Sequence, residues 1–114
     1  MKEFNSTIRV TLFHDTETSP FTLHADHFDF EPVSGNDAGG QYWDCSRDFI
    51  VDRPSDYIRW LLRYARSGSV SISDSQGNVY TIGSIELPAR IHLSAHLDKC
   101  RLHVSCKMLV NPLL

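Results

Sequence analysis

The sequence lacks the long hydrophobic runs that mark proteins of membranes and of the secretory pathway. No apolar stretch approaches the ~20 residues that a membrane-spanning helix requires. Residues 1–5 do not combine a basic with an apolar region, as a secretory signal does. We therefore expect a soluble, cytoplasmic protein without a membrane partner.

A disulfide framework is also missing. The three cysteines, Cys45, Cys100 and Cys106, are odd in number, and none belongs to a CxxC pair. If Cys100 and Cys106 share one strand, they lie about 20 Å apart, far beyond the ~7 Å between Cα atoms that a disulfide tolerates. We expect buried free thiols.

Enzyme motifs are absent as well. The sequence contains no GxSxG, no GxxxxGK[ST] and no GxGxxG string, and its serines, histidines and acids follow no recognisable catalytic pattern. His92, His96 and Cys100 have the spacing of metal ligands only on a helix. On a strand the two histidines lie about 13 Å apart and cannot share a zinc ion. We expect no metal, no cofactor and no enzymatic activity.

An excess of basic charge is absent too. The formal net charge is −3, which argues against a general nucleic-acid binder. Residues 1–52 hold ten acidic and three basic residues, a net −7, whereas residues 53–114 hold eight basic and four acidic residues, a net +4. If the fold places these halves on different faces, copies of the chain attract one another head to tail.

What is present is the composition of one globular domain spanning residues 1–114. Of these 114 residues 41% are hydrophobic and 22% charged, which suffices for a single core. Apolar and polar residues alternate over 7–13, which predicts a strand, and 21–30 and 41–51 predict further strand segments. Residues 32–40 are rich in proline, glycine and asparagine and predict an exposed loop.

One helix is predicted from Asp52 to Ser67. Its apolar residues recur at i, i+3, i+4 and i+7, namely Ile58, Leu61, Leu62 and Ala65. Asp52 or Ser55 suits the N-cap, and Gly68 suits a left-handed position after the end. A second stripe of the helix combines arginines with aromatics, namely Tyr57, Arg59, Trp60, Arg63, Tyr64 and Arg66. Because these residue types dominate interface energetics, the stripe is a candidate protein contact. The alternatives are a solvated helix face and a nucleic-acid contact.

Two hairpins are predicted after the helix. The first turns at residues 74–78, where Gly77 and Asn78 accept left-handed backbone. The second pairs residues 90–97 with 100–109 around a turn at Asp98-Lys99, and every second residue of both strands faces the core. The outward face carries further candidate contact residues, namely His92, His96, Arg101 and His103.

These elements predict an α+β protein: a mainly antiparallel β-sandwich or partial barrel of about seven strands, with the helix Asp52–Ser67 packed against it. The order of strands, helix and two hairpins resembles the small sandwich of bacteriophage tail-tube and distal-tail proteins. In that family, sandwiches join edge to edge into rings that stack along the tail, and a long loop reaches the neighbouring subunit. The matching loop here is residues 33–40, which is short and predicts no extended arm.

The resemblance implies a structural protein of a phage or prophage tail or baseplate, found in the virion or the host cytoplasm. Its expected partners are proteins, in a homo-oligomer or a heteromeric assembly, and not a specific nucleic acid. Two alternatives stay open. A small inhibitor or regulator would bind one host protein through the acidic segment 26–31, and a small hydrolase would use a site that no motif reveals.

Overall fold

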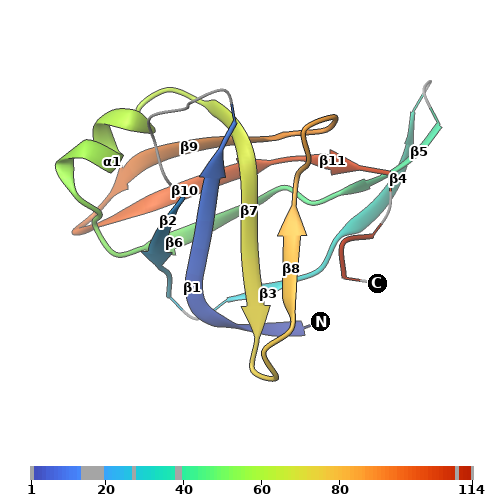
Figure 1. Ribbon diagram of the computed structural model, residues 1–114, viewed down its shortest axis with the longest axis horizontal. Helices are drawn as coiled ribbons and strands as arrows, with labels where there is room; N and C mark the ends of the chain where they lie inside the picture. The colour runs from blue at the N-terminus through green and yellow to red at the C-terminus, as the bar shows by residue number, and fades with distance from the viewer. Residues whose placement is uncertain (1, 14–19, 27, 38–39, 110, 114) are drawn as a thin grey trace.

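Figure 1 shows the computed structural model, which describes residues 2–13, 20–26, 28–37, 40–109 and 111–113. Within these ranges the chain forms eleven mostly antiparallel strands and one short helix, which confirms the predicted fold class. The elements are β1 (Lys2–Leu12), β2 (Phe21–His24), β3 (Asp29–Phe30), β4 (Val33–Asp37), β5 (Gly40–Asp44), β6 (Arg47–Val51), α1 (Asp56–Leu61), β7 (Arg66–Asp74), β8 (Val79–Ile82), β9 (Ala89–His96), β10 (Lys99–Ser105) and β11 (Lys107–Met108).

The main sheet curls round until its two end strands meet. Its strand order is β2-β1-β7-β9-β10-β6, with β3 paired to β1 and β8 paired to β7. At its ends, Ala25 and Val51 form a bridge. The Asp26 N–H donates to the Ile50 carbonyl (2.8 Å) and the Asp52 N–H to the His24 carbonyl (2.7 Å). The sheet thus closes into a small barrel, which leaves few open backbone edges.

The core fills this barrel with the inward residues of each strand. Ile8 and Val10 of β1 and Val70 of β7 are fully buried, whereas Arg9 between the first two is exposed. This alternation is the period-2 pattern expected of strands with one buried face. Aromatic rings close the lower part of the barrel, where the rings of Phe28 and Phe49 lie edge to face at 4.9 Å.

The helix is much shorter than predicted. It spans Asp56–Leu61 instead of Asp52–Ser67, and the Ser55 hydroxyl accepts a hydrogen bond from the Ile58 N–H at its start. Leu61 and Leu62 are buried, but the predicted core residue Ala65 is exposed. The helix stops early because residues 66–74 pair as β7 with β1 and β9, which is incompatible with further helical turns over the same residues.

Gly68, predicted to end the helix, instead lies inside β7. A Cβ atom at this position would sit 2.3 Å from the carbonyl oxygen of Thr11 on β1. Glycine is therefore required by the close approach of two strands, and not by a left-handed cap.

Both predicted hairpins are present, the second with a different turn. The strands β9 and β10 turn at Leu97 and Asp98, so that Ala95 lies opposite Cys100 and Leu93 opposite Leu102. The predicted turn at Asp98-Lys99 is therefore wrong by one residue. Leu97, assigned to the core, is 89% exposed and has a φ of 52°. Ala95, also predicted to face the core, is exposed, whereas Ile91, Leu93, Cys100, Leu102 and Val104 are buried as predicted.

The predicted loop 32–40 is mostly strand. Residues 33–37 and 40–44 form the hairpin β4–β5, and β11 adds a third strand to it; residues 38–39 lie outside the described ranges. This small sheet projects from one end of the barrel, while α1 lies at the opposite end of the long axis (Figure 1). The expectation that the chain has no extended arm is therefore wrong.

Candidate functional site

The first predicted contact surface lies on α1 and the residues directly after it. We call Tyr57, Trp60, Arg63 and Tyr64 the helix-end surface. The Tyr57 and Trp60 rings are stacked with centroids 6.3 Å apart, and the Arg63 guanidinium lies 4.3 Å from the Trp60 ring centroid and 4.9 Å from that of Tyr64. Trp60 is 55% exposed and Tyr64 is 72% exposed. An ordered cation–π cluster of large aromatics thus faces outward.

Arg59 and Arg66 do not join this cluster. Arg66 lies at the start of β7, and its Nε donates to the Leu61 carbonyl (2.6 Å), so it is held against the end of the helix. Arg59 forms an ion pair with Asp56 on its own helix. The predicted stripe of six residues is divided because the helix ends before its last turn.

Arg59 instead lines a pocket of about 180 Å³ between α1 and β9. Arg53 and Arg63 also line it, and no acidic side chain among the described residues does; Leu93, Ser94, Ala95 and Cys100 complete the wall. Within the described part of the chain, Arg53 has no ion-pair partner, and the buried Nε of Arg59 has no hydrogen-bond partner. Three arginines thus line this small pocket, although the Arg63 guanidinium packs on the Trp60 ring and Arg59 is paired with Asp56. The positive charge of Arg53 beside them favours an anionic group as the occupant.

A hydrogen-bonded chain of three side chains lies on the outer face of β6, β9 and β10. The Ser94 hydroxyl is 2.9 Å from Nε2 of His103, and Nδ1 of the same ring is 2.9 Å from a carboxylate oxygen of Asp48. The ladder positions them, because His103 lies directly opposite Asp48 on β6, and Ser94 is its diagonal neighbour on β9. We call this set the Ser94 relay.

The partners of His103 determine which ring nitrogen carries the proton. A carboxylate only accepts hydrogen bonds, so Nδ1 bears the hydrogen and donates to Asp48. In the neutral ring, Nε2 is then an acceptor and receives the Ser94 hydroxyl hydrogen. The ring is thereby oriented to take a proton from serine, which is the arrangement that nucleophilic serine chemistry requires.

The other predicted residues of this face surround the relay. The His92 ring stacks on His103 with centroids 5.2 Å apart. Arg101 lies opposite Ser94 in the ladder, and its guanidinium donates to Nδ1 of His96 at 3.3 Å. The structure thus brings all four predicted residues of the outward face together.

Sequence reasoning missed Ser94 and Asp48 as parts of this cluster. Ser94 was placed on the outward face with the histidines, but it was not recognised as a hydrogen-bond partner of His103. Asp48 belongs to β6, and nothing in the sequence indicated that β6 pairs with β10. The only available signal was the alternation around Phe49, which places Asp48 on an outward face.

Part of the opposite charge of the two sequence halves is paired inside the molecule. Lys99 contacts Asp26 through a short ion pair and Asp52 at 3.4 Å. The hydrogen bond that Lys99 donates to the Asp26 carboxylate is the main reason that the pKa of Lys99 is raised. Lys99 of the second half thus meets two acidic residues of the first half within one chain. The two halves are therefore in direct contact at this position.

The projecting sheet has an apolar surface of its own. Tyr42, Leu87, Met108 and Leu109 line a hollow of about 140 Å³ beside β5 and β11, and we call these four residues the hairpin-end surface. Leu109 is 73% exposed, and the Lys107 ammonium lies 4.5 Å from the Tyr42 ring centroid. The helix-end and hairpin-end surfaces therefore lie at opposite ends of the long axis, which measures 40 Å.

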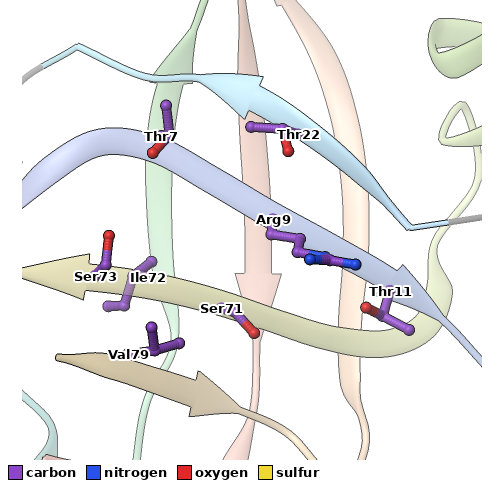
Figure 2. A pocket seen from close by; sticks show the side chains of 8 residues that line it. All are labelled: Thr7, Arg9, Thr11, Thr22, Ser71, Ile72, Ser73 and Val79. Atoms are coloured by element: carbon purple, nitrogen blue, oxygen red, sulfur yellow. The ribbon is translucent and has the colours of Figure 1, made fainter. Parts of the chain in front are cut away.

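A third hollow, of about 390 Å³, lies on the outer face of β1, β2, β7 and β8. Figure 2 shows the Arg9 side chain among the hydroxyl groups of Thr7, Thr11, Thr22 and Ser71. Among the described residues that line it there is no histidine and no acidic residue.

Among the described residues, no group of three or more histidine, cysteine or acidic side chains is arranged to hold a metal ion. No helix within the described ranges is long and apolar enough to cross a membrane. The chain matches no family model, no curated protein and no solved structure.

Proposed function

We propose that this chain is a structural subunit that joins neighbouring copies of itself, as the subunits of phage tails and baseplates do. One observation carries the proposal: large apolar side chains are exposed on two different surfaces at opposite ends of the molecule. Contiguous exposed apolar surface on a soluble domain is typical of a contact site. Two unlike surfaces at opposite ends favour a head-to-tail contact, which propagates into a ring or a filament.

The chemistry of the two surfaces supports this pairing. The helix-end surface presents flat aromatic rings whose orientation is fixed by stacking on Arg63. The hairpin-end surface presents a small apolar hollow of the kind into which an aromatic anchor fits. Because large apolar side chains dominate both surfaces, we expect burial of apolar surface to be the main driving force of the proposed contact.

The projecting hairpin β4–β5 supports the phage-tail form of the proposal. It occupies the position in the chain where tail proteins carry the loop that reaches a neighbouring subunit. β4 (Val33–Asp37) is an edge strand of the small sheet, so its outer backbone groups are open to pairing with another chain.

A mixing experiment tests the head-to-tail contact. Trp60→Ser with Tyr64→Ser removes the helix-end surface, and Leu109→Ser with Leu87→Ser removes the hairpin-end surface. Light scattering across a range of protein concentrations should show oligomers for the unmodified chain and monomers for each double variant alone. An equimolar mixture should form a one-to-one dimer and nothing larger, because each variant retains one intact and complementary surface.

Val79→Ser is the matched control. Val79 is 66% exposed and apolar but lies in neither surface, so its substitution should leave the oligomers unchanged. A monomeric unmodified chain at all concentrations would contradict self-assembly and favour the small inhibitor. Oligomers that persist in both double variants would contradict the assignment of the surfaces.

A further inference from the structure

We propose that the Ser94 relay and the adjacent arginine pocket form a hydrolytic site for esters that carry an anionic group. This activity does not depend on self-assembly. It rests on the convergence of a hydroxyl, an imidazole and a carboxylate from three strands, with the atoms in the order that a serine nucleophile requires.

The position of Ser94 links the relay to the pocket. Ser94 bonds to His103 on one side and belongs to the wall lined by Arg53, Arg59 and Arg63 on the other. A pocket of about 180 Å³ is smaller than the sites of drug-sized ligands, so it fits one carboxylate or phosphate group and leaves the ester bond near Ser94.

The backbone beside Ser94 supplies a donor for the developing negative charge. The Leu93 N–H points away from β10 and donates to the Leu62 carbonyl at 3.0 Å. Because N–H directions alternate along a strand, the Ala95 N–H points to the same side, where β7 no longer runs beside β9. No described residue accepts from it. The N–H of the residue after the nucleophile is the donor that many serine hydrolases use for the oxyanion.

The reaction balances with these groups alone. The Ser94 oxygen bonds to the ester carbonyl carbon as its proton moves to Nε2 of His103, and the negative charge collects on the carbonyl oxygen. The carbon–oxygen bond to the alcohol then breaks, and the alcohol leaves with the proton from Nε2. Water repeats the sequence on the acyl-serine: its proton passes to Nε2 and then to the departing Ser94 oxygen, which releases the acid. Asp48 stays ionised and acts as a positioning residue.

Labelling with an alkyl fluorophosphonate tests the nucleophile. Mass spectrometry should locate one adduct on Ser94 of the intact chain, with loss of fluoride. Ser94→Ala and His103→Asn should both abolish the adduct, while Ser105→Ala should be labelled like the unmodified chain. Ser105 is exposed on the same strand as His103 but takes no part in the relay. No adduct on Ser94 of the unmodified chain, or labelling at an unchanged rate in His103→Asn, would overturn the proposal.

Asp48 is tested by the difference between two conservative variants. Asp48→Asn should slow labelling about tenfold or more, because an amide no longer holds His103 in the required tautomer. Asp48→Glu retains the carboxylate and should recover part of the rate. Equal rates for both variants would overturn the positioning role. Circular dichroism of each variant shows whether the fold is retained.

The substrate class is tested with two activated esters. Mono-4-nitrophenyl succinate carries a free carboxylate, and 4-nitrophenyl acetate does not. Arg53→Gln should raise KM for the succinate ester about tenfold, as expected for the loss of one charged hydrogen-bonding partner, and leave KM for the acetate ester unchanged. Arg9→Gln, on another face of the barrel, should change neither value. Equal effects on both esters would overturn the anionic substrate class.

Discussion

Replacing Leu97 by glycine should stabilise the protein. Leu97 stands at the tip of the β9–β10 hairpin with a φ of 52°, and among the described residues it is the only non-glycine with a positive φ. This left-handed backbone costs a side-chain-bearing residue about 1–2 kcal/mol, whereas glycine adopts it freely. Since Leu97 is 89% exposed, the substitution sacrifices little buried surface.

The net gain follows from two opposing effects. Glycine relieves the strain but adds about 0.5–1 kcal/mol of conformational entropy to the unfolded chain. The expected increase in the free energy of unfolding is therefore about 0.5–1 kcal/mol. For a chain of 114 residues, with an unfolding entropy of about 2 cal/mol/K per residue, this raises Tm by about 2–4 °C.

Urea denaturation and thermal unfolding by circular dichroism measure this gain. Leu97→Ala is the matched control, because it removes the same exposed side chain but keeps the strained φ, and it should leave the stability nearly unchanged. A loss of stability in Leu97→Gly, or an equal gain in both variants, would refute the assignment of strain to this turn.

Three further predictions concern the core, one buried carboxyl and the thiols. Phe49→Ala should lower the free energy of unfolding by about 3–5 kcal/mol in urea denaturation, because Phe49 is buried against Phe28 and the cavity cannot collapse inside a closed barrel; a loss under 1 kcal/mol would contradict the packing. Burial favours the neutral form of Asp74, but hydrogen bonds from Asn78, Gln76 and Tyr80 outweigh it and hold the pKa of this carboxyl below its ordinary value of 3.8. The ionised carboxyl therefore stabilises the fold fully above pH 3.8, and this contribution is lost as the pH falls through the lower folded-state pKa. In Asp74→Asn the free energy of unfolding should depend less on pH in this range than in the unmodified chain. An equal pH dependence of both proteins would contradict this role of Asp74. Burial raises the pKa of the Cys45 thiol to about 12, so iodoacetamide at pH 8 should modify Cys45 only after the protein unfolds; rapid modification in the native state would be inconsistent with a closed core.

The strands were predictable to the extent that each has one buried face. Alternation placed Ile8, Val10 and Leu102 in the core, and all three are buried. The helix was overestimated because Ala65 continues the helical spacing, although strand pairing from Arg66 onward competes for the same residues. Local patterns cannot predict whether helix or strand wins over these residues, because the outcome depends on strand partners that are distant in the sequence.

The candidate sites also divide into those that depend on local sequence and those that depend on contacts between distant segments. The exposed aromatic residues of the helix were identified from their residue types, because exposure on a short amphipathic helix is a local property. The Ser94 relay was not identified from the sequence, because it depends on the pairing of β6 with β10. This pairing brings Asp48 next to His103, 55 positions away in the sequence. The arginine pocket likewise required the position of α1 over the edge of β9.

The junction between the two end strands of the main sheet, β2 and β6, determines where the barrel opens first. We call this junction the seam. It is held by the backbone hydrogen bonds of Asp26 and Asp52, and Lys99 forms ion pairs with both carboxylates. Salt screens these exposed ion pairs and weakens them, but it leaves the packing of the apolar interior unaffected. Amide protons along the seam should therefore exchange with deuterium sooner than those between β1 and β7, and added sodium chloride should widen the difference, which makes this the line along which the barrel first comes apart.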